Sequence, residues 1–292
     1  MNPDLKFVCV GATKCGTTWL SSVLRGHPEI NVSLNKEPCY FSVHYGRGPQ
    51  WYASIWKDQP GLKGEFTNYY MFSKKALDRL KNDYPDVRII VLLREPIARS
   101  ISHYKMVRRT RDFKNFQSIS EESPAIFNRS FYYEALKSVY DIFPAENIFV
   151  GFYDEIQNDP ADFLKQVCRF LKVDDNYLPK NLNRQFGKGF IPKFRKLDKI
   201  RQGVHDFLIE KQMYRTVLWI KKTGLPDKFK SLIAQKATKD EIPMSVFESY
   251  RGAFLEDLSK LKNADFISNK SYIKGWEQKL SQSIEGKQKK AS

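Results

Sequence analysis

Apolar positions along the first 171 residues alternate between two kinds of spacing. Short continuous apolar runs, typical of strands buried on both faces of a sheet, occur at residues 6–10, 87–93 and 148–152. Elsewhere apolar residues recur at every third or fourth position, which is the spacing of an amphipathic helix. The alternation predicts an α/β fold, a doubly wound parallel sheet with flanking helices. The helical stretches are residues 17–25, 76–84, a stretch from Ile97, 131–143 and 160–171.

The pattern changes in the last third of the chain. Residues 181–241 are basic and irregular, with helical spacing only around residues 204–220, and we interpret them as a mobile insert or a lid. After Trp276 the chain is rich in Lys, Gln, Ser and Gly, which predicts a disordered basic tail over residues 277–292. One domain is therefore expected over residues 1–276.

A glycine loop follows the first expected strand. Residues 11–18 read GATKCGTT and match the phosphate-binding pattern GxxxxGK[ST], except that Thr17 stands where the lysine belongs. Lys14 lies inside the loop instead. The loop amides and the helix start can still hold a phosphate. This P-loop-like sequence therefore fits one 5′-phosphate with a short extension better than a triphosphate bound with Mg²⁺.

The loop and the second apolar run together resemble the signatures of sulfotransferases that use 3′-phosphoadenosine 5′-phosphosulfate (PAPS). The loop continues as TKCGTTWL, and the run reads VRIIVLLREPIARSISHY, in which Ser102 follows Arg94 by eight residues. The resemblance implies that Lys14 is catalytic, because a cation there stabilises charge on the leaving phosphate. It also implies that Arg94 and Ser102 bind the 3′-phosphate. Trp19 either stacks on adenine or belongs to the core. The expected cofactor-binding residues are Lys14, Cys15, Gly16, Thr17, Thr18, Trp19, Arg94, Ser102, Lys188 and Gly189.

A second segment resembles the glycan-modifying branch of that family, whose members act on substrates such as heparan sulfate. Residues 37–41 read EPCYF and are similar to the branch's Glu-x-x-aromatic-Phe segment, which implies that Glu37 is the catalytic general base. The alternative is a surface glutamate paired with Lys36. His44 and His103 are the other candidates for the base.

One position departs from the branch. Its members often carry a lysine directly after the glutamate of the block that here begins with Gly64-Glu65, and this chain has Phe66 there. If such a lysine takes part in catalysis, Lys63 is the candidate to replace it. The resemblance extends from Lys6 to Trp276 and is thinnest over residues 181–241.

The composition of the chain limits the classes of ligand and acceptor that we expect it to bind. The 292 residues carry a formal net charge of +16, which implies an anionic ligand. The expected donor is PAPS, and the expected acceptor is a glycan or glycoconjugate that receives a sulfonate on a hydroxyl or amine. No run of apolar residues is long enough for a transmembrane helix, and the opening residues do not read as a signal peptide. The four cysteines form no CxxC pair and have no histidine cluster beside them, so we expect no metal site and a cytoplasmic protein.

Two other function classes stay open on the residues alone. A P-loop kinase or phosphotransferase would need Mg²⁺ and a lysine at Thr17, and it has no use for Arg94 with Ser102. A non-catalytic basic binder of acidic glycan or nucleic acid fits the charge, but no nucleic-acid-binding motif is present, so we expect no nucleic-acid partner.

Overall fold

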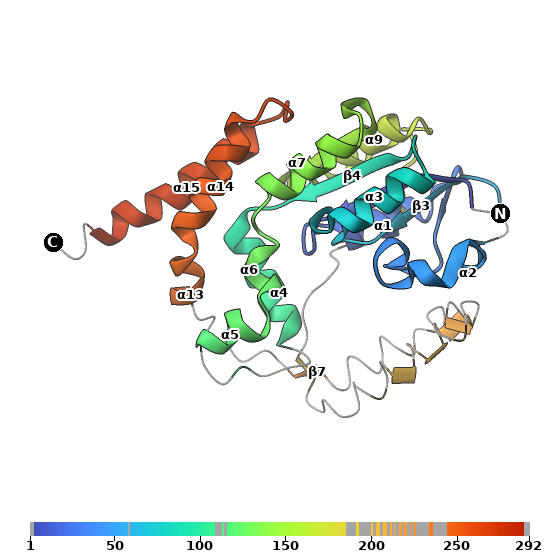
Figure 1. Ribbon diagram of the computed structural model, residues 1–292, viewed down its shortest axis with the longest axis horizontal. Coiled ribbons are helices and arrows are strands. Elements are labelled where there is room, and N and C mark those ends of the chain that lie inside the picture. Colours follow the sequence, from blue (N-terminus) through green and yellow to red (C-terminus); the bar gives the residue numbers. More distant parts are fainter. Residues whose placement is uncertain are drawn as a thin grey trace.

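The centre of the molecule is a five-stranded sheet (Figure 1). The structure, a computed structural model, describes residues 3–57, 59–108, 113, 116–184 and 244–288, with scattered positions from 191 to 235. The strand order is β2-β3-β1-β4-β5, and all neighbouring strands are parallel. The expected doubly wound parallel sheet is confirmed. The strands are β1 (Leu5–Gly11), β2 (Ile30–Val32), β3 (Leu62–Phe66), β4 (Arg88–Leu93) and β5 (Ile148–Phe152).

Helices cover both faces of this sheet (Figure 1). The chain crosses from β1 toward β2 in one direction and from β3 to β4 in the other, and right-handed crossovers then place the connecting helices on opposite faces. Accordingly α3 contacts α7 on one face. On the other face α1 contacts α9, where the rings of Trp19 and Phe163 lie 6.0 Å apart. The helices of these layers are α1 (Thr17–Leu24), α3 (Lys74–Asp83), α7 (Tyr133–Ile142) and α9 (Pro160–Leu171).

The remaining helices are shorter or lie at the sheet's edges. Beside β5, the C-terminal pair α14 and α15 packs together, and α14 contacts α7. A short antiparallel pair, β6 (Ile191–Pro192) with β7 (Ala234–Gln235), lies within the basic insert. The helices are α2 (Gly48–Ser54), α4 (Pro96–Val107), α5 (Phe116–Glu122), α6 (Ala125–Asn128), α8 (Tyr153–Asn158), α13 (Met244–Ser249), α14 (Arg251–Asn263) and α15 (Ser271–Gln288).

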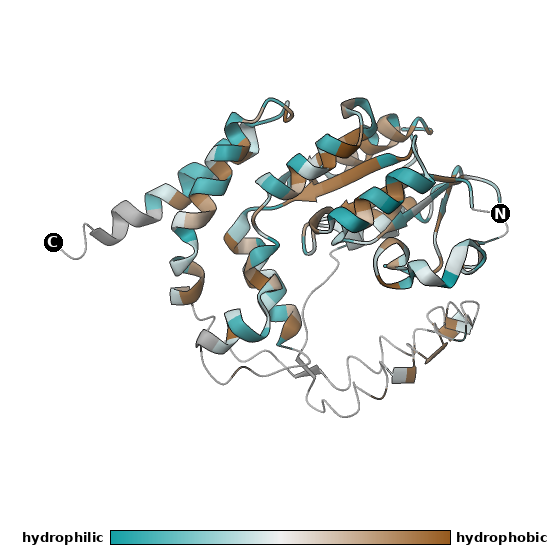
Figure 2. Ribbon diagram, in the orientation of Figure 1, coloured by the Kyte–Doolittle hydropathy of each residue, from teal (hydrophilic) through white to brown (hydrophobic). Residues whose placement is uncertain are grey.

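Strand β4 shows why the apolar runs form the core. Its residues from Ile89 to Leu93 are fully buried, and Figure 2 shows the strand hydrophobic along its length. Val91 pairs with Gly11 of β1 on one side and with Val150 of β5 on the other. A strand with neighbours on both sides and helices on both faces has no polar environment to face, so its sequence is continuously apolar.

The C-terminal tail differs from the sequence prediction. The prediction of disorder from residue 277 is wrong for residues 277–288, because α15 continues without a break to Gln288. Ile273, Trp276 and Leu280 are buried at helical spacing, and buried Arg251 donates a hydrogen bond of 2.6 Å to the carbonyl of Leu280. This apolar face gives the polar-looking segment a reason to be helical. Residues 289–292 and most of residues 185–243 lie outside the described residues.

Two features of the chain bear on its cellular location. No helix in the described ranges combines the length and the apolar composition needed to cross a bilayer. All four cysteines carry free thiols, and Cys9, Cys15 and Cys168 are buried. The cytoplasmic location stays a prediction.

Candidate active site

Three loops meet where the central strands end. The glycine loop follows β1, Thr67 and Asn68 follow β3, and Arg94 and Glu95 follow β4. Strand β1 lies between β3 and β4, so the sheet's connections diverge on either side of it. In open α/β sheets this switch point, at the carboxyl ends of the strands, is where ligands bind.

The loop after β1 has the backbone of an anion-binding turn. Lys14 (φ 74°) and Gly16 (φ 99°) both adopt left-handed conformations, which are uncommon for a lysine. A Cβ at Gly16 would lie 2.7 Å from Cδ1 of Ile156 in α8, so glycine is required here. Helix α1 begins at Thr17, and its first amides have no acceptor within the helix. An anion in the loop would face both the loop amides and the positive end of α1.

Arg94 is held beside this loop. Its Nη1 donates to the carbonyl of Lys14 at 3.3 Å, and its guanidinium lies 4.3 Å from the ring centre of Tyr153. The next residue, Glu95, caps α4 by accepting hydrogen bonds from the amides of Ile97 and Ala98. The start of α4 therefore fixes the position of Arg94, and the stacked guanidinium remains available to a phosphate.

Ser102 lies two turns further along α4. It is half-buried, and within the described residues no hydrogen bond joins it to the loop or to Arg94. Its role toward a 3′-phosphate stays a prediction.

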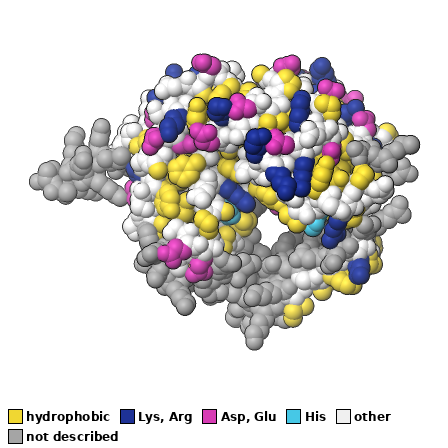
Figure 3. Space-filling view, viewed as in Figure 1, with side chains coloured by type: hydrophobic (Ala, Val, Ile, Leu, Met, Phe, Trp, Pro, Cys, Tyr) yellow, Lys and Arg dark blue, Asp and Glu magenta, His cyan; other side chains and the backbone are white. Residues whose placement is uncertain are grey.

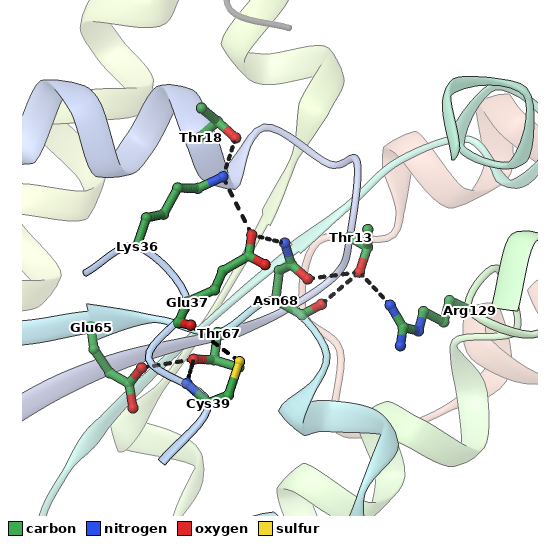
Figure 4. A network of polar contacts seen from close by, with 9 residues as sticks. All are labelled: Thr13, Thr18, Lys36, Glu37, Cys39, Glu65, Thr67, Asn68 and Arg129. Carbon is green, nitrogen blue, oxygen red and sulfur yellow. Dashed lines mark hydrogen bonds and ion pairs between the residues drawn. The ribbon is translucent and has the colours of Figure 1, made fainter. Parts of the chain in front are cut away.

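Glu37 lies in a strained turn close to the loop (Figure 4). Its φ is 63°, and its amide donates to the carbonyl of Phe66 at 3.0 Å. Its Oε1 accepts a hydrogen bond of 2.6 Å from Nδ2 of Asn68 and lies 3.3 Å from Nζ of Lys36. The predicted pair with Lys36 is therefore present, but Lys36 also donates to the hydroxyl of Thr18 at 2.7 Å. The pair is part of the loop's surroundings and not an isolated surface contact.

A second arm of the same network runs from Asn68 to Arg129. The hydroxyl of Thr13 donates to Oδ1 of Asn68 at 2.8 Å and to the Asn68 carbonyl at 3.1 Å. It accepts from Nη1 of Arg129 at 3.2 Å, and that guanidinium also lies over the ring of Tyr69. Sequence reasoning missed Thr13, Asn68 and Arg129. The only signal in the sequence was that Thr13 lies within the loop, Asn68 in the block that begins with Gly64-Glu65, and Arg129 shortly before residues 131–143.

Below Glu37 lies a fully buried carboxylate, Glu65. It accepts hydrogen bonds from the hydroxyls of Tyr52, Thr67 and Tyr70. The Thr67 hydroxyl in turn accepts from the amide of Cys39, at the end of the Glu37 turn. Burial raises the pKa of Glu65 to about 7, because desolvation outweighs the three hydrogen bonds that favour its charged form. Glu65 supports the turn that carries Glu37 from beneath.

Basic side chains are visible on one face of the molecule. Figure 3 shows several Lys and Arg side chains near the middle of the face seen in Figure 1. A cavity of about 690 Å³ lies at the opposite end of the sheet, beside Asp4, Tyr84 and Arg88, and holds none of the site residues.

Comparison with known proteins decides the family. The sulfotransferase domain model matches residues 4–188. The chain belongs to the sulfotransferase family. The membrane-associated sulfotransferase kil1 of Dictyostelium discoideum is 35% identical over 103 residues, covering 34% of this chain and 22% of that protein. Heparan sulfate glucosamine 3-O-sulfotransferase 3B1 of Mus musculus is 27% identical over 197 residues, covering 63% of this chain and 50% of that protein. The chain thus spans half or less of the length of these curated relatives.

The fold is also that of a sulfotransferase. The crystal structure of a sulfotransferase from Alicyclobacillus acidocaldarius superposes with a TM-score of 0.56 at 23% identity, covering 74% of this chain and 96% of that chain. The resemblance to the glycan-modifying branch is confirmed, since relatives at this level include heparan sulfate 3-O-sulfotransferases.

Several expected sulfotransferase residues lie away from the network. The ring of Trp19 is buried, and its Nε1 donates to the carbonyl of Leu182 at 2.8 Å, which favours the core alternative over adenine stacking. Phe66 is buried in β3, so no charged group stands at that position. Lys63 lies at the opposite end of β3 from Asn68, half-buried. Lys188 and Gly189 lie outside the described residues.

The two histidines also have other surroundings. His103 is buried in α4, where Nδ1 lies 3.2 Å from the carbonyl of Ala125, and burial together with the cation of Arg99 lowers its pKa to about 3. A group so reluctant to accept a proton makes a poor base. His44 lies beside the ring of Trp51, and burial lowers its pKa as well. Neither histidine belongs to the network around Glu37.

Proposed function

We propose that this sulfotransferase transfers a sulfonate group from PAPS to a hydroxyl or amine of a carbohydrate acceptor. One observation supports this most directly. The Glu37 carboxylate is hydrogen-bonded through Asn68 to Thr13, the residue that precedes Lys14 in the phosphate loop. The group that would accept the acceptor's proton and the cation that would stabilise the leaving group are thus held by one connected set of contacts.

The residues around the loop fit the two phosphates of PAPS. A side chain at Gly16 would collide with Ile156 and Tyr153 of α8, so glycine preserves the turn whose amides would meet a 5′-phosphate. Arg94 sits one hydrogen bond away from Lys14 and can take the 3′-phosphate on its planar guanidinium. Both phosphates would therefore be met by cations that the protein already holds in place.

The transfer is an in-line displacement at sulfur. The acceptor oxygen or nitrogen attacks sulfur, and the bond between sulfur and the 5′-phosphate oxygen breaks. The acceptor's proton passes to Glu37, and adenosine 3′,5′-bisphosphate leaves with the electron pair. Lys14 stabilises the charge that develops on the leaving oxygen, and Glu37 acts as general base.

The acceptor class rests on similarity and charge. Relatives that match 62–63% of this chain are named for heparan sulfate glucosamine, and the chain's net charge of +16 favours an anionic polymer. A sulfated or carboxylated glycan therefore agrees with both observations.

Transfer of radiolabelled sulfonate from PAPS to a panel of acceptors tests the proposal. The panel contains heparan sulfate, a neutral oligosaccharide, a tyrosine peptide and a small phenol. We expect label in the glycan, and E37Q should reduce it by about 10²- to 10⁴-fold, the usual cost of removing a general base. Label in the peptide or phenol alone would overturn the acceptor class, and E37Q turnover near the wild-type rate would remove Glu37 from the step.

Ligand-induced thermal stabilisation distinguishes the rival functions. Adenosine 3′,5′-bisphosphate should raise Tm more than ATP with Mg²⁺, and EDTA should leave transfer unchanged. The opposite order of stabilisation, with activity that depends on Mg²⁺, would indicate a kinase. Stabilisation by heparan sulfate without any transfer would indicate a non-catalytic binder.

A further inference from the structure

Asn68, in the loop after β3, forms side-chain hydrogen bonds with two residues that are distant in the sequence, Glu37 and Thr13. Its side chain is 8% exposed and uses both ends of its amide. Nδ2 donates to Glu37 at 2.6 Å, and Oδ1 accepts from the hydroxyl of Thr13 at 2.8 Å (Figure 4). A buried amide satisfied at both ends holds one orientation, because rotating it would place its oxygen against a carboxylate.

The hydrogen bonds along this line all point the same way. The guanidinium of Arg129 donates to Thr13, Thr13 donates to Asn68, and Asn68 donates to Glu37. A carboxylate oxygen accepts hydrogen bonds, so the line of donors ends on the acceptor that Glu37 provides. Bonds aligned in this way polarise and strengthen one another.

Contacts on the other side of Glu37 also hold its carboxylate and its backbone in place. Lys36 lies 3.3 Å from the same oxygen, Oε1. The carboxylate thus has a cation beside it and a side-chain amide fixed against it, and the Glu37 turn is held by the hydrogen bond that its backbone amide donates to the Phe66 carbonyl. Within the described part of the chain both groups act on Oε1, which leaves Oε2 as the oxygen that would meet an incoming acceptor.

We infer that Asn68 is a positioning residue that holds the Glu37 carboxylate aimed at the acceptor, and that Thr13 couples this orientation to the phosphate loop. The inference rests on the proposed role of Glu37 as general base. It adds two residues outside the expected site, Asn68 and Thr13, and it makes the base and Lys14 parts of one rigid unit.

Steady-state transfer from PAPS to the best acceptor of the panel tests this, with pH–rate profiles of the wild type, E37Q, N68A, N68D and T13V. N68A should lower kcat roughly 10- to 100-fold, the cost of a misaligned catalytic group. KM and the affinity for adenosine 3′,5′-bisphosphate should stay within about twofold, because Asn68 contacts neither ligand in this scheme. T13V keeps the shape of threonine and should lower kcat in the same direction.

N68D gives the readout that a merely structural role would not move. It keeps the shape of Asn68 but sets a carboxylate against Glu37, and two carboxylates sharing a site oppose each other's ionisation. The acid limb of its pH–rate profile should move up by about one pH unit or more. N31A is the matched control, since Asn31 is also a buried asparagine with two hydrogen bonds, to the carbonyls of Lys57 and Gln59. It should lose stability and keep the wild-type profile.

The outcomes separate the inference from the proposed function. An inactive wild type, or an E37Q variant with normal turnover, would overturn the proposed function. An inactive E37Q together with normal kcat and pH profile in N68A and N68D would overturn the inference alone. If N68A does not fold, N68D and T13V decide, and an unshifted acid limb in N68D would mean that Asn68 supports only the fold.

Discussion

The ammonium of Lys36 donates a 2.7 Å hydrogen bond to the hydroxyl of Thr18, in the first turn of α1. The same nitrogen lies 3.3 Å from the Glu37 carboxylate. Lys36 therefore joins a residue expected to bind the 5′-phosphate to the residue expected to act as base. Position 66 supplies no cation, because Phe66 is buried there, whereas Lys36 contacts both Thr18 and Glu37.

Lys36→Met is expected to lower both kcat and the affinity for adenosine 3′,5′-bisphosphate. One charge-assisted contact is worth about 1.5–3 kcal/mol, so each effect should be roughly 10- to 100-fold. Transfer kinetics and calorimetric titration measure the two effects. Lys74→Met is the matched control, because Lys74 is exposed and paired with Asp78 on α3. Equal kinetics for both variants would mean that Lys36 forms only a surface contact with no role in transfer or binding.

Lys14→Ala is expected to abolish most of the turnover while the fold persists. Removing a donor to developing oxyanion charge costs about 10²- to 10³-fold in kcat. The left-handed backbone at residue 14 suits alanine no less than lysine, so Tm should change little. Lys6→Ala, at the opposite end of β1, is the control for charge removal. A Lys14→Ala enzyme with normal turnover would exclude Lys14 from the chemistry.

The sequence predicted the parts of the fold that depend on local pattern. Residues 148–152 and 160–171 match β5 and α9 at both ends. Helix α9 begins where Asp159 caps it and ends where Lys172 turns left-handed, at φ 59°. Strands β2 and β3 were not predicted. They are short, with three and five residues. Strand β3 reads LKGEF, and its polar residues interrupt the continuous apolar run that marks the other buried strands.

Sequence patterns named candidate site residues that belong to recognisable motifs. They missed residues that only folding brings together from distant segments. Lys14 and Arg94 come from two motifs, and the structure confirms that they are neighbours. Thr13 and Asn68 are 55 positions apart, and nothing in a local pattern shows that their side chains touch. The burial of Trp19 depends likewise on Phe163 and Leu182, which only the folded chain brings to it.

Arg94→Ala is expected to weaken adenosine 3′,5′-bisphosphate far more than adenosine 5′-phosphate. The planar guanidinium above Tyr153 suits a phosphate that only the first ligand carries in the 3′ position. A charge-assisted contact of this kind predicts a loss of roughly 10- to 100-fold. Arg88→Ala, at the other end of β4, serves as the control. Equal weakening of both ligands would show that Arg94 shapes the loop through its bond to Lys14.

Glu65→Gln is expected to change how stability depends on pH. Burial raises the pKa of Glu65 from 4.5 to about 7, so between these values the folded state holds a proton that the unfolded state has lost. The folded protein then binds more protons, and its stability must fall as pH rises through this window. The contribution is fully present below about pH 4.5 and is lost above about pH 7.

Urea unfolding of the wild type and Glu65→Gln at several pH values between 5 and 8 measures this contribution. Titrations common to both proteins cancel in the difference between their unfolding free energies. That difference should fall by roughly 2 to 3 kcal/mol from pH 5 to pH 8, because one pKa unit corresponds to about 1.4 kcal/mol. The sign matters, since a carboxylate stabilised by its three hydroxyl donors would make the wild type gain stability over the same range. A flat difference would mean that Tyr52, Thr67 and Tyr70 fully offset the desolvation of Glu65. The turn that carries Glu37 would then rest on an ionised carboxylate at every working pH.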